Sequence, residues 1–339
     1  MTSGWNRKGH EIRSAKGAGV LLSLLLFGAL AAGQESPALV EPPQQTIRVN
    51  VNRVDVGVIV TNAKGEFVEG LQRDDFAIFD DGNPQAVTDF ASIDAPAQVL
   101  LLLEAGPAVY MLEDSHLYVA SALLANLAAG DRVAIAAYNE TPTPILDYTT
   151  DKHMAEGALD QIHFNLGFGN LNLATSLNAV LDWLGRLPGK KTIVLVSSGV
   201  DTSPPEAMQA VLRRLETGDV MILAVSMSGP LRNGKKGTKQ QIAQTEEAFA
   251  QADAWLKALS GATGGRAYFP ENAKAFQEAY RQMANLVRHE YSLAFAPPKA
   301  DGGAHAIEVK VKGGAETKNG TPVFRVEHRQ GYVAPKAGE

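Results

Sequence analysis

Four short, almost entirely apolar runs constrain the fold of this chain more than any other feature. They are Val99–Leu103, Arg132–Tyr138, Thr192–Val196 and Val220–Val225. A strand that is apolar at successive positions is covered on both faces, as in a parallel sheet. Helical patterns lie between and after these runs, at 116–127, 174–187, 206–215, 246–259 and 274–287. Strand and helix in alternation predict a doubly wound, mostly parallel α/β sheet.

The sequence on either side of this region has the period-two alternation of half-buried strands. Residues 46–60 alternate apolar and polar side chains, as one bent strand or a strand pair does. Three more candidate strands follow His289, at 291–295, 306–311 and 323–327. Neither flanking segment alone has enough core, but together they have the size of a sandwich domain. We therefore predict one β-sandwich, built from 46–97 and 290–334, that is interrupted by an α/β domain at 98–289 and followed by a tail at 335–339.

The first 33 residues have the order of a secretory signal. Four basic residues precede the apolar stretch Val20–Leu26, which is followed by the small residues of 29–33. This order predicts a cleaved signal peptide at 1–33, a proline-containing linker at 34–45, and a periplasmic or extracellular protein. The alternative is an uncleaved membrane anchor, since the 18 uncharged residues of 17–34 reach the lower limit of a spanning helix.

Composition excludes several classes of function. The chain has 339 residues and no cysteine, so disulfides, thiolate nucleophiles, zinc–thiolate sites and iron–sulfur clusters are ruled out. The net charge is −6, and it becomes −9 without the leader, which holds four basic residues and one acid. This balance argues against a nucleic-acid partner.

Several motifs occur in an order that resembles one known family. They are Val68–Phe76 with Asp80–Gly82, Asp131–Val133, Ala262–Arg266 and Arg329–Tyr332. The order resembles the von Willebrand factor type A (VWA) domain and, more narrowly, the bacterial exported proteins with a VWFA-related domain that are best known from acidobacteria. The resemblance implies a domain that binds protein ligands, usually through a magnesium site at the top of its sheet.

The family's metal-binding pattern is incomplete in this chain. The resemblance leads us to expect D-x-S-x-S after the first apolar strand, but the sequence reads Glu104-Ala105-Gly106-Pro107-Ala108. A hard cation needs about six oxygen ligands, and too few remain. The resemblance therefore implies a degenerate site without a metal or another cofactor. Its five positions are Glu104, Gly106, Ala108, Leu171 (in place of Thr) and Ser198 (in place of Asp).

Glu104 is the one carboxylate that remains in this degenerate pattern. Without a metal, the carboxylate of Glu104 should accept hydrogen bonds from nearby backbone N–H groups or from Ser198. The alternative is a rebuilt site that uses Glu104, Asp201 and Glu140 and favours calcium, the more forgiving ion. Asn172 and Thr175 stand near Leu171 only as displaced substitutes for the missing hydroxyl.

A basic segment adds to the predicted binding surface. Pro230–Lys239 holds four basic residues and follows the strand at 220–225, so it should lie at the same edge of the sheet as Glu104. It is either a solvated loop or an electropositive contact for an acidic partner. The predicted partner-binding rim consists of Glu104, Asn172, Ser198, Asp201, Arg232, Lys235 and Lys236.

Other motifs do not amount to an active site. Ser197–Asp201 follows a central strand, but it lacks the G-x-S-x-G elbow, and His163 has no triad-like neighbours. Gly167–Gly169 lacks the third glycine of a dinucleotide fingerprint. Asn139 and Asn319 begin chance glycosylation triplets. We therefore expect a non-enzymatic protein-binding or scaffolding module; the alternatives are a cation-dependent adhesion module and, less favoured, a hydrolase.

Overall fold

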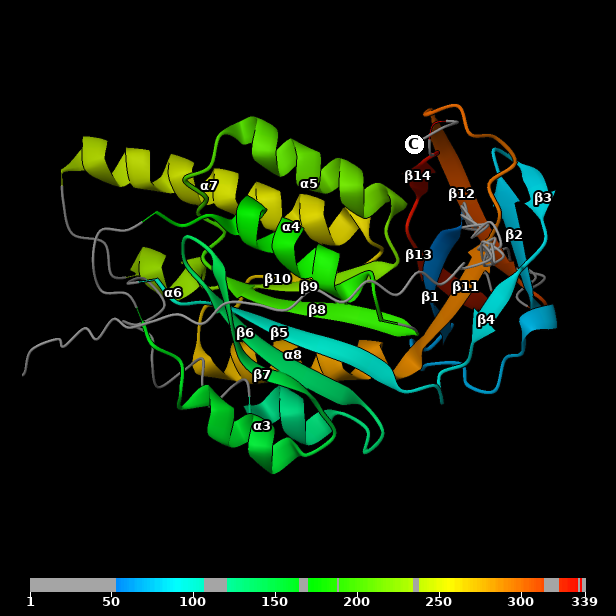
Figure 1. Ribbon diagram of the computed structural model, residues 1–339, viewed down its shortest axis with the longest axis horizontal. Helices are drawn as coiled ribbons and strands as arrows, with labels where there is room; N and C mark the ends of the chain where they lie inside the picture. The colour runs from blue at the N-terminus through cyan, green and yellow to red at the C-terminus, as the bar shows by residue number, and fades with distance from the viewer. Residues whose placement is uncertain are drawn as a thin grey trace, which may run out of the picture. The chain divides into compact units, whose positions relative to one another are not determined.

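Three sheets organise the part of the chain that the computed structural model describes (Figure 1). That part comprises residues 53–106, 121–164, 170–187, 189–233, 238–313, 323–334 and 336. The predicted leader, linker and most of the tail lie outside the described residues. So do Ala108, Gly167–Gly169, Lys235, Lys236 and Asn319.

A six-stranded sheet forms the centre of the α/β part. Its strands have the order β10-β9-β8-β5-β6-β7, and they pair in parallel except for β6 with β7. Every residue of β5 and β8 is buried, which explains why these strands are so rich in apolar side chains. The bounds are β5 Ala97–Glu104, β6 Arg132–Tyr138, β7 Pro142–Thr149, β8 Lys190–Ser197, β9 Val220–Ser226 and β10 Ala267–Tyr268.

Helices cover both faces of this sheet. Even-numbered residues of β5, such as Leu100 and Leu102, pack in the core beneath α4, α5 and α7, whereas Leu101 and Leu103 pack against α3, α8 and the helical residues 121–126. In Figure 1 the helices α4, α5 and α7 lie above the sheet, and α3 and α8 lie below it. The bounds are α3 Lys152–Leu159, α4 Leu173–Leu184, α5 Pro205–Thr217, α6 Ser228–Asn233, α7 Lys239–Ala262 and α8 Ala273–His289. Within the described ranges, no helix is both long and apolar enough to cross a membrane.

Two antiparallel sheets complete the described structure. Their orders are β13-β1-β11-β4 and β14-β12-β2-β3, so each sheet combines strands from both flanking segments. One shared core includes Val58, Ile78, Tyr291 and Val309. A short 3-10 helix, η1, spans Arg73–Asp75. The strand bounds are β1 Val54–Asn62, β2 Phe76–Asp80, β3 Asn83–Gln85, β4 Asp89–Ala91, β11 Glu290–Phe295, β12 Ala304–Val311, β13 Phe324–His328 and β14 Gly331–Val333.

The predicted fold class is confirmed: a mostly parallel α/β sheet is accompanied by antiparallel sheets from the N- and C-terminal segments. Several details differ from the sequence prediction, and the largest concern the α/β part. The prediction missed β7, an edge strand containing two prolines, and the short helix α3. The predicted basic loop at 230–239 is wrong as a single loop, because α6 includes Pro230 and Arg232, and α7 begins at Lys239.

Candidate functional site

The carboxyl ends of the parallel strands bring the main candidate residues together. Glu104 at the end of β5 is in register with Tyr138 at the end of β6, and Ser197 ends the neighbouring strand β8. Open α/β sheets bind ligands outside this edge, because the loops that follow the strands meet there. This edge is therefore the first place to look for a site.

Glu104 has a side chain that is completely buried yet satisfied by hydrogen bonds. Its exposed fraction is 0%. Oε2 accepts from the backbone N–H of Ser198 at 2.8 Å, and the Ser198 hydroxyl lies 2.8 Å from Oε2 and 3.0 Å from Oε1. Ser197 Oγ and Tyr138 OH donate to Oε2 at 3.1 and 3.3 Å. The predicted hydrogen bond from Ser198 is confirmed; the contacts from Ser197 and Tyr138 were not predicted.

Burial sets the protonation of this cluster. It raises the pKa of Glu104, and the donors from Ser198, Ser197 and Tyr138 oppose that rise by stabilising the carboxylate. Burial and the neighbouring carboxylate raise the pKa of Tyr138 well above its ordinary value, so the phenol stays protonated and can donate. The Ser197 hydroxyl lies 2.7 Å from Tyr138 OH and accepts from the backbone N–H of Gly199 at 2.8 Å. The group is a closed hydrogen-bonded network.

Gly106 and Leu171 fit each other beside this network. A Cβ atom added to Gly106 would lie 2.9 Å from Leu171 Cδ2 and 3.4 Å from Glu104 Oε1. A serine at position 106 would therefore require Leu171 to move. The two residues that replace hydroxyl-bearing residues of the family pattern are thus packed against each other.

Asn172 and Asp201 lie in two adjoining loops that hydrogen bonds hold together. Thr202 exchanges hydrogen bonds with the backbone of Leu171, and Thr202 Oγ1 lies 3.2 Å from Asn172 Oδ1. Asp201 Oδ2 accepts from the backbone N–H of Ala174, in the first turn of α4, at 3.2 Å. Asp201 Oδ1 accepts from Ser203 N at 2.9 Å, so both oxygens of Asp201 hold loops in place. Among the described residues, Glu104, Asp201 and Glu140 do not converge as a group that could hold a metal, and the structure gives the rebuilt site no support.

Arg232 is held by α7 rather than free on the rim. Its guanidinium lies 2.8 Å from Asp253 Oδ2 and 3.6 Å from Glu246 Oε2, and it stacks over the ring of Phe249. Asp253 also accepts from Ser226 and Ser228 at 3.1 and 3.0 Å. The charge of Arg232 is therefore matched by acidic residues of α7, and its place in the partner-binding rim stays a prediction. Sequence spacing alone does not reveal that α6 and α7 adjoin here.

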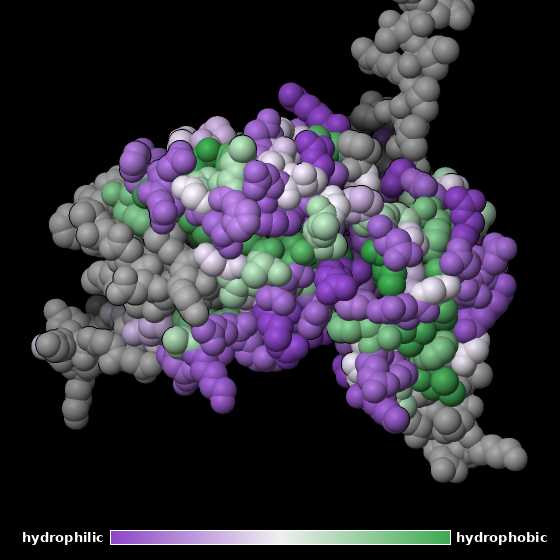
Figure 2. Space-filling view, turned by 90° about the horizontal axis from the view of Figure 1, so that it is seen from below, coloured by the Kyte–Doolittle hydropathy of each residue, from purple (hydrophilic) through white to green (hydrophobic). Residues whose placement is uncertain are grey.

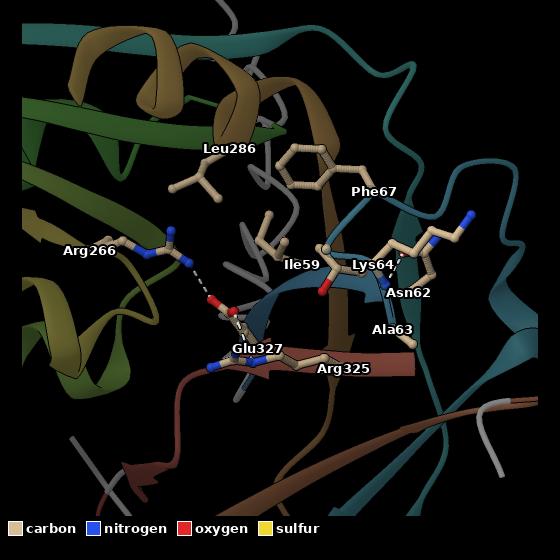
Figure 3. A pocket seen from close by; sticks show the side chains of 11 residues that line it. Ile59, Asn62, Ala63, Lys64, Phe67, Arg266, Leu286, Arg325 and Glu327 are labelled. Atoms are coloured by element: carbon tan, nitrogen blue, oxygen red, sulfur yellow. Dashed lines mark hydrogen bonds and ion pairs between the residues drawn. The ribbon is translucent and has the colours of Figure 1, made fainter. Parts of the chain in front are cut away.

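A second candidate site is a cavity of about 820 Å³ beside β1 and β13 (Figure 3). Arg266 and Arg325 both face Glu327, with distances of 2.6 and 3.4 Å from Glu327 oxygens. Ile59 and Phe67 form part of its apolar lining. Because two guanidinium groups share one carboxylate, this cavity has an excess of positive charge. No sequence motif predicted the cavity.

The chain resembles solved structures of other proteins at low sequence identity. None of the curated proteins matches the chain significantly. Among solved structures, a von Willebrand factor type A protein from Catenulispora acidiphila is 10% identical, with a TM-score of 0.46, over 85% of this chain and 75% of that one. An aerotolerance-related membrane protein from Bacteroides fragilis is 15% identical, with a TM-score of 0.44, over 56% of this chain and 98% of that one.

A family model agrees with the arrangement of the six-stranded sheet and its helices. The model describes the von Willebrand factor type A domain, and it matches residues 117–282. This range contains β6 to β10 and ends within α8. The chain therefore matches the VWA domain over residues 117–282.

Proposed function

We propose that this chain is an exported, non-enzymatic protein-binding or scaffolding module whose VWA domain contacts its partner through the predicted rim without a metal ion. VWA domains are usually non-catalytic modules that bind proteins. The observation that carries the metal-free part of the proposal is the Glu104 carboxylate, which is fully buried and already accepts hydrogen bonds from three side chains and one backbone N–H.

The residues present do not fit magnesium. This ion demands a near-octahedral shell of oxygens. Gly106 offers no side-chain oxygen, and Leu171 packs an apolar group where the family pattern has a hydroxyl. Glu104 would also have to exchange the hydrogen bonds from Tyr138, Ser197 and Ser198 for the ion. Each of these points supports a site that no longer binds a cation.

The same network argues against a hydrolase. A serine nucleophile needs a base that accepts its proton. The Ser197 and Ser198 hydroxyls donate to Glu104, but the two serines are 0% and 1% exposed, so neither hydroxyl is open to a substrate. Their positions suit a structural network better than a nucleophile exposed to substrate.

The exposed surface favours recognition by polar contacts and shape. Met154 is the one large apolar side chain that is strongly exposed among the described residues. Figure 2 shows hydrophilic side chains over much of the α/β part on the viewed face, with hydrophobic ones scattered between them. A large apolar interface, which would need a continuous patch, is not indicated for the α/β part on this face.

The metal-free proposal is tested by thermal unfolding in the presence of millimolar magnesium or calcium. We expect the same melting temperature with and without either ion, in both the wild type and Glu104→Ala, because a ligand stabilises a protein only by binding its folded state. A rise in the wild type that disappears in Glu104→Ala would show a living cation site and overturn the proposal.

The rim is tested by a matched pair of variants used as bait for envelope proteins of the native host. Asn170→Arg adds a bulky charge at an exposed position next to Leu171, whereas Asn126→Arg adds the same charge close to where β6 begins, at the opposite edge of the sheet. We expect Asn170→Arg to lose a partner that the wild type and Asn126→Arg retain. Equal capture by all three proteins would place the interface elsewhere.

Export and the domain boundaries stay predictions. Mass spectrometry of the protein from the native host should find a first residue close to position 33, and a mature chain that begins at Met1 would favour the anchor alternative. Limited proteolysis should separate the α/β domain at 98–289 from the paired segments 46–97 and 290–334 only by cuts near their junctions.

A further inference from the structure

A group of ligand-type side chains lies in the β-sandwich, on elements that do not contribute to the rim. Asp80 ends β2, Asp81 follows it in the turn to β3, and His305 lies on β12. One ligand atom from each residue lies within 4.8 Å of the other two. The two neighbouring carboxylates are more than 200 positions from His305 in the sequence. They meet it because β2 and β12 are paired, with Asp80 opposite Ile307.

The imidazole ring of His305 is oriented by contacts on its other side. Nε2 lies 3.2 Å from Asp301 Oδ1, and that oxygen also accepts from the backbone N–H of Gly303 at 2.8 Å. The ring stacks on Tyr332 with a centroid distance of 5.2 Å. A carboxylate that binds one ring nitrogen and turns the other toward an ion is the usual support of a metal-ligating histidine. Here it turns Nδ1 toward Asp80 and Asp81.

The atoms that converge have no hydrogen bonds to one another. His305 Nδ1 lies 3.2 Å from Asp80 Oδ1 and 2.9 Å from Asp81 Oδ2. Both Nδ1 and Asp80 Oδ1 are nevertheless buried without a hydrogen-bond partner, and Asp80 is only 2% exposed. These atoms are therefore close to one another without forming hydrogen bonds.

This spacing is that of ligands around a shared ion. Two ligand atoms that each lie about 2.1 Å from one zinc ion, at angles between about 90° and 110°, are about 3.0 to 3.4 Å apart. Of the two distances from His305 Nδ1, 3.2 Å falls in that range and 2.9 Å lies just below it. An unpartnered buried carboxylate oxygen costs free energy, and a bound cation would remove that cost.

Asp81 is fixed in place by the backbone of β12. Its N–H donates to the carbonyl of Ala306 at 2.9 Å, and its Oδ1 accepts from Ala306 N at 2.9 Å, which leaves Oδ2 directed at His305. Asp81 is also the one non-glycine residue with a positive φ, 46°, among the described residues. This φ is that of the two-residue turn between β2 and β3, in which Gly82 also has a positive φ, so the turn fixes the position from which the Asp81 side chain projects.

We propose that Asp80, Asp81 and His305 bind one divalent transition-metal ion, and that zinc is the ion they fit best. One imidazole nitrogen with carboxylate oxygens suits zinc, whereas magnesium and calcium take oxygen ligands. The side chain of Asp81 is 48% exposed, so an ion and its remaining water ligands have access from solvent. The ion links the β2–β3 turn to β12 and so stabilises the edge of the sandwich.

The competing occupant is a proton. A doubly protonated His305 would pair with the same carboxylates and would leave nothing for zinc to bind. The two occupants are distinguished by titrating zinc chloride into the purified full chain, after treatment with a chelator, in a calorimeter at pH 7.5. We expect one zinc ion per chain, and no competition from magnesium or calcium at millimolar concentration.

Variants locate the site. Asp81→Asn should weaken zinc binding at least tenfold and His305→Gln should abolish it, whereas Asp301→Asn, which keeps all three ligands, should weaken it by about 10- to 100-fold. His153→Gln is the matched control, because the His153 side chain is 98% exposed and far from this group in sequence, and its affinity should equal that of the wild type. Circular dichroism checks that each variant folds. If His305→Gln does not fold, the zinc affinity of Asp81→Asn tests the proposal.

Two results would overturn the proposal. The first is the absence of zinc binding to the folded wild type, which would assign the cluster to a protonated histidine. The second is equal affinity in the wild type, Asp81→Asn and His305→Gln, which would show adventitious binding elsewhere on the surface. Neither result depends on Glu104, so failure here is separate from failure of the metal-free rim.

Discussion

The guanidinium of Arg329 donates to the backbone carbonyl of Leu215 at 3.0 Å, at the C-terminal end of α5. It also donates to the carbonyl of Glu216 and, at 2.9 Å, to that of Gly218. The last carbonyls of a helix have no partners within the helix and carry a partial negative charge. A buried cation from the C-terminal β segment satisfies them, and this contact ties that segment to the α/β part.

Replacing Arg329 should therefore be costly. We expect Arg329→Met, which keeps most of the aliphatic side chain, to lower the free energy of unfolding by about 3 kcal/mol, because several buried carbonyls lose a charged donor. Urea unfolding measures the change. Arg325→Met is the control: its side chain is 77% exposed and its ion pair with Glu327 should contribute less than about 1 kcal/mol. Equal effects of the two substitutions would contradict this account.

Stability should depend on pH through Glu290. Burial raises the pKa of Glu290 from 4.5 to about 7, and nearby Lys190 only partly opposes the rise. Between these pH values the folded state keeps a proton that the unfolded state releases, so the free energy of unfolding falls as pH rises. Above pH 7, the decrease in the free energy of unfolding that Glu290 causes approaches about 3 kcal/mol.

The variant Glu290→Gln isolates this contribution. Its side chain carries no charge, so we expect a flatter pH dependence between 4.5 and 7 than in the wild type, measured by urea unfolding at several pH values. Glu308→Gln, which removes an exposed carboxylate on β12, should leave the wild-type slope unchanged. An unchanged slope in Glu290→Gln would show that the residue ionises normally.

The fit between Gly106 and Leu171 predicts coupled mutations. Gly106→Ser alone should lower the free energy of unfolding by about 1 to 3 kcal/mol, because the new side chain meets Leu171 Cδ2. Leu171→Thr in the same chain should recover part of that loss. A double-mutant cycle measures the coupling, and strictly additive effects would mean that the two side chains do not contact each other.

Gly265 should tolerate no side chain. A Cβ atom there would overlap the backbone carbonyl of Ile222 in β9, so Gly265→Ala must displace a central strand. We expect little or no folded protein by circular dichroism. Gly261→Ala, four positions earlier in α7, meets nothing within 4 Å and should be neutral or slightly stabilising. A stable Gly265→Ala would contradict the packing described for this turn.

Some of this structure could be read from sequence because burial leaves a local pattern. The strands β5, β8 and β9 are covered on both faces, so their apolar runs are unambiguous. In contrast, β7 contains Pro142 and Pro144, which only an edge strand accepts, and its pattern does not resemble a central strand.

The candidate sites were less accessible because they depend on pairing between distant segments. The hydrogen bond from Ser198 to Glu104 followed from the family pattern, but the contacts of Tyr138 and Ser197 depend on the order of three strands. The pairing of Arg232 with Asp253 required the position of α6 against α7. His305 meets Asp80 only through the register of β12 with β2.

The interleaving of β1 with β11 and β13 has a consequence for how the chain is made. Val58 pairs with both Tyr291 and His328, each more than 200 positions later in the chain. Closing so long a loop is slow, and β1 cannot pair with β11 or β13 until residues 290–328 have been synthesised. During synthesis β1 and β2 therefore present unpaired edges, which invite association between chains. A chaperone that covers these edges, or a delay in folding, would protect the nascent chain until β11 and β13 have been made.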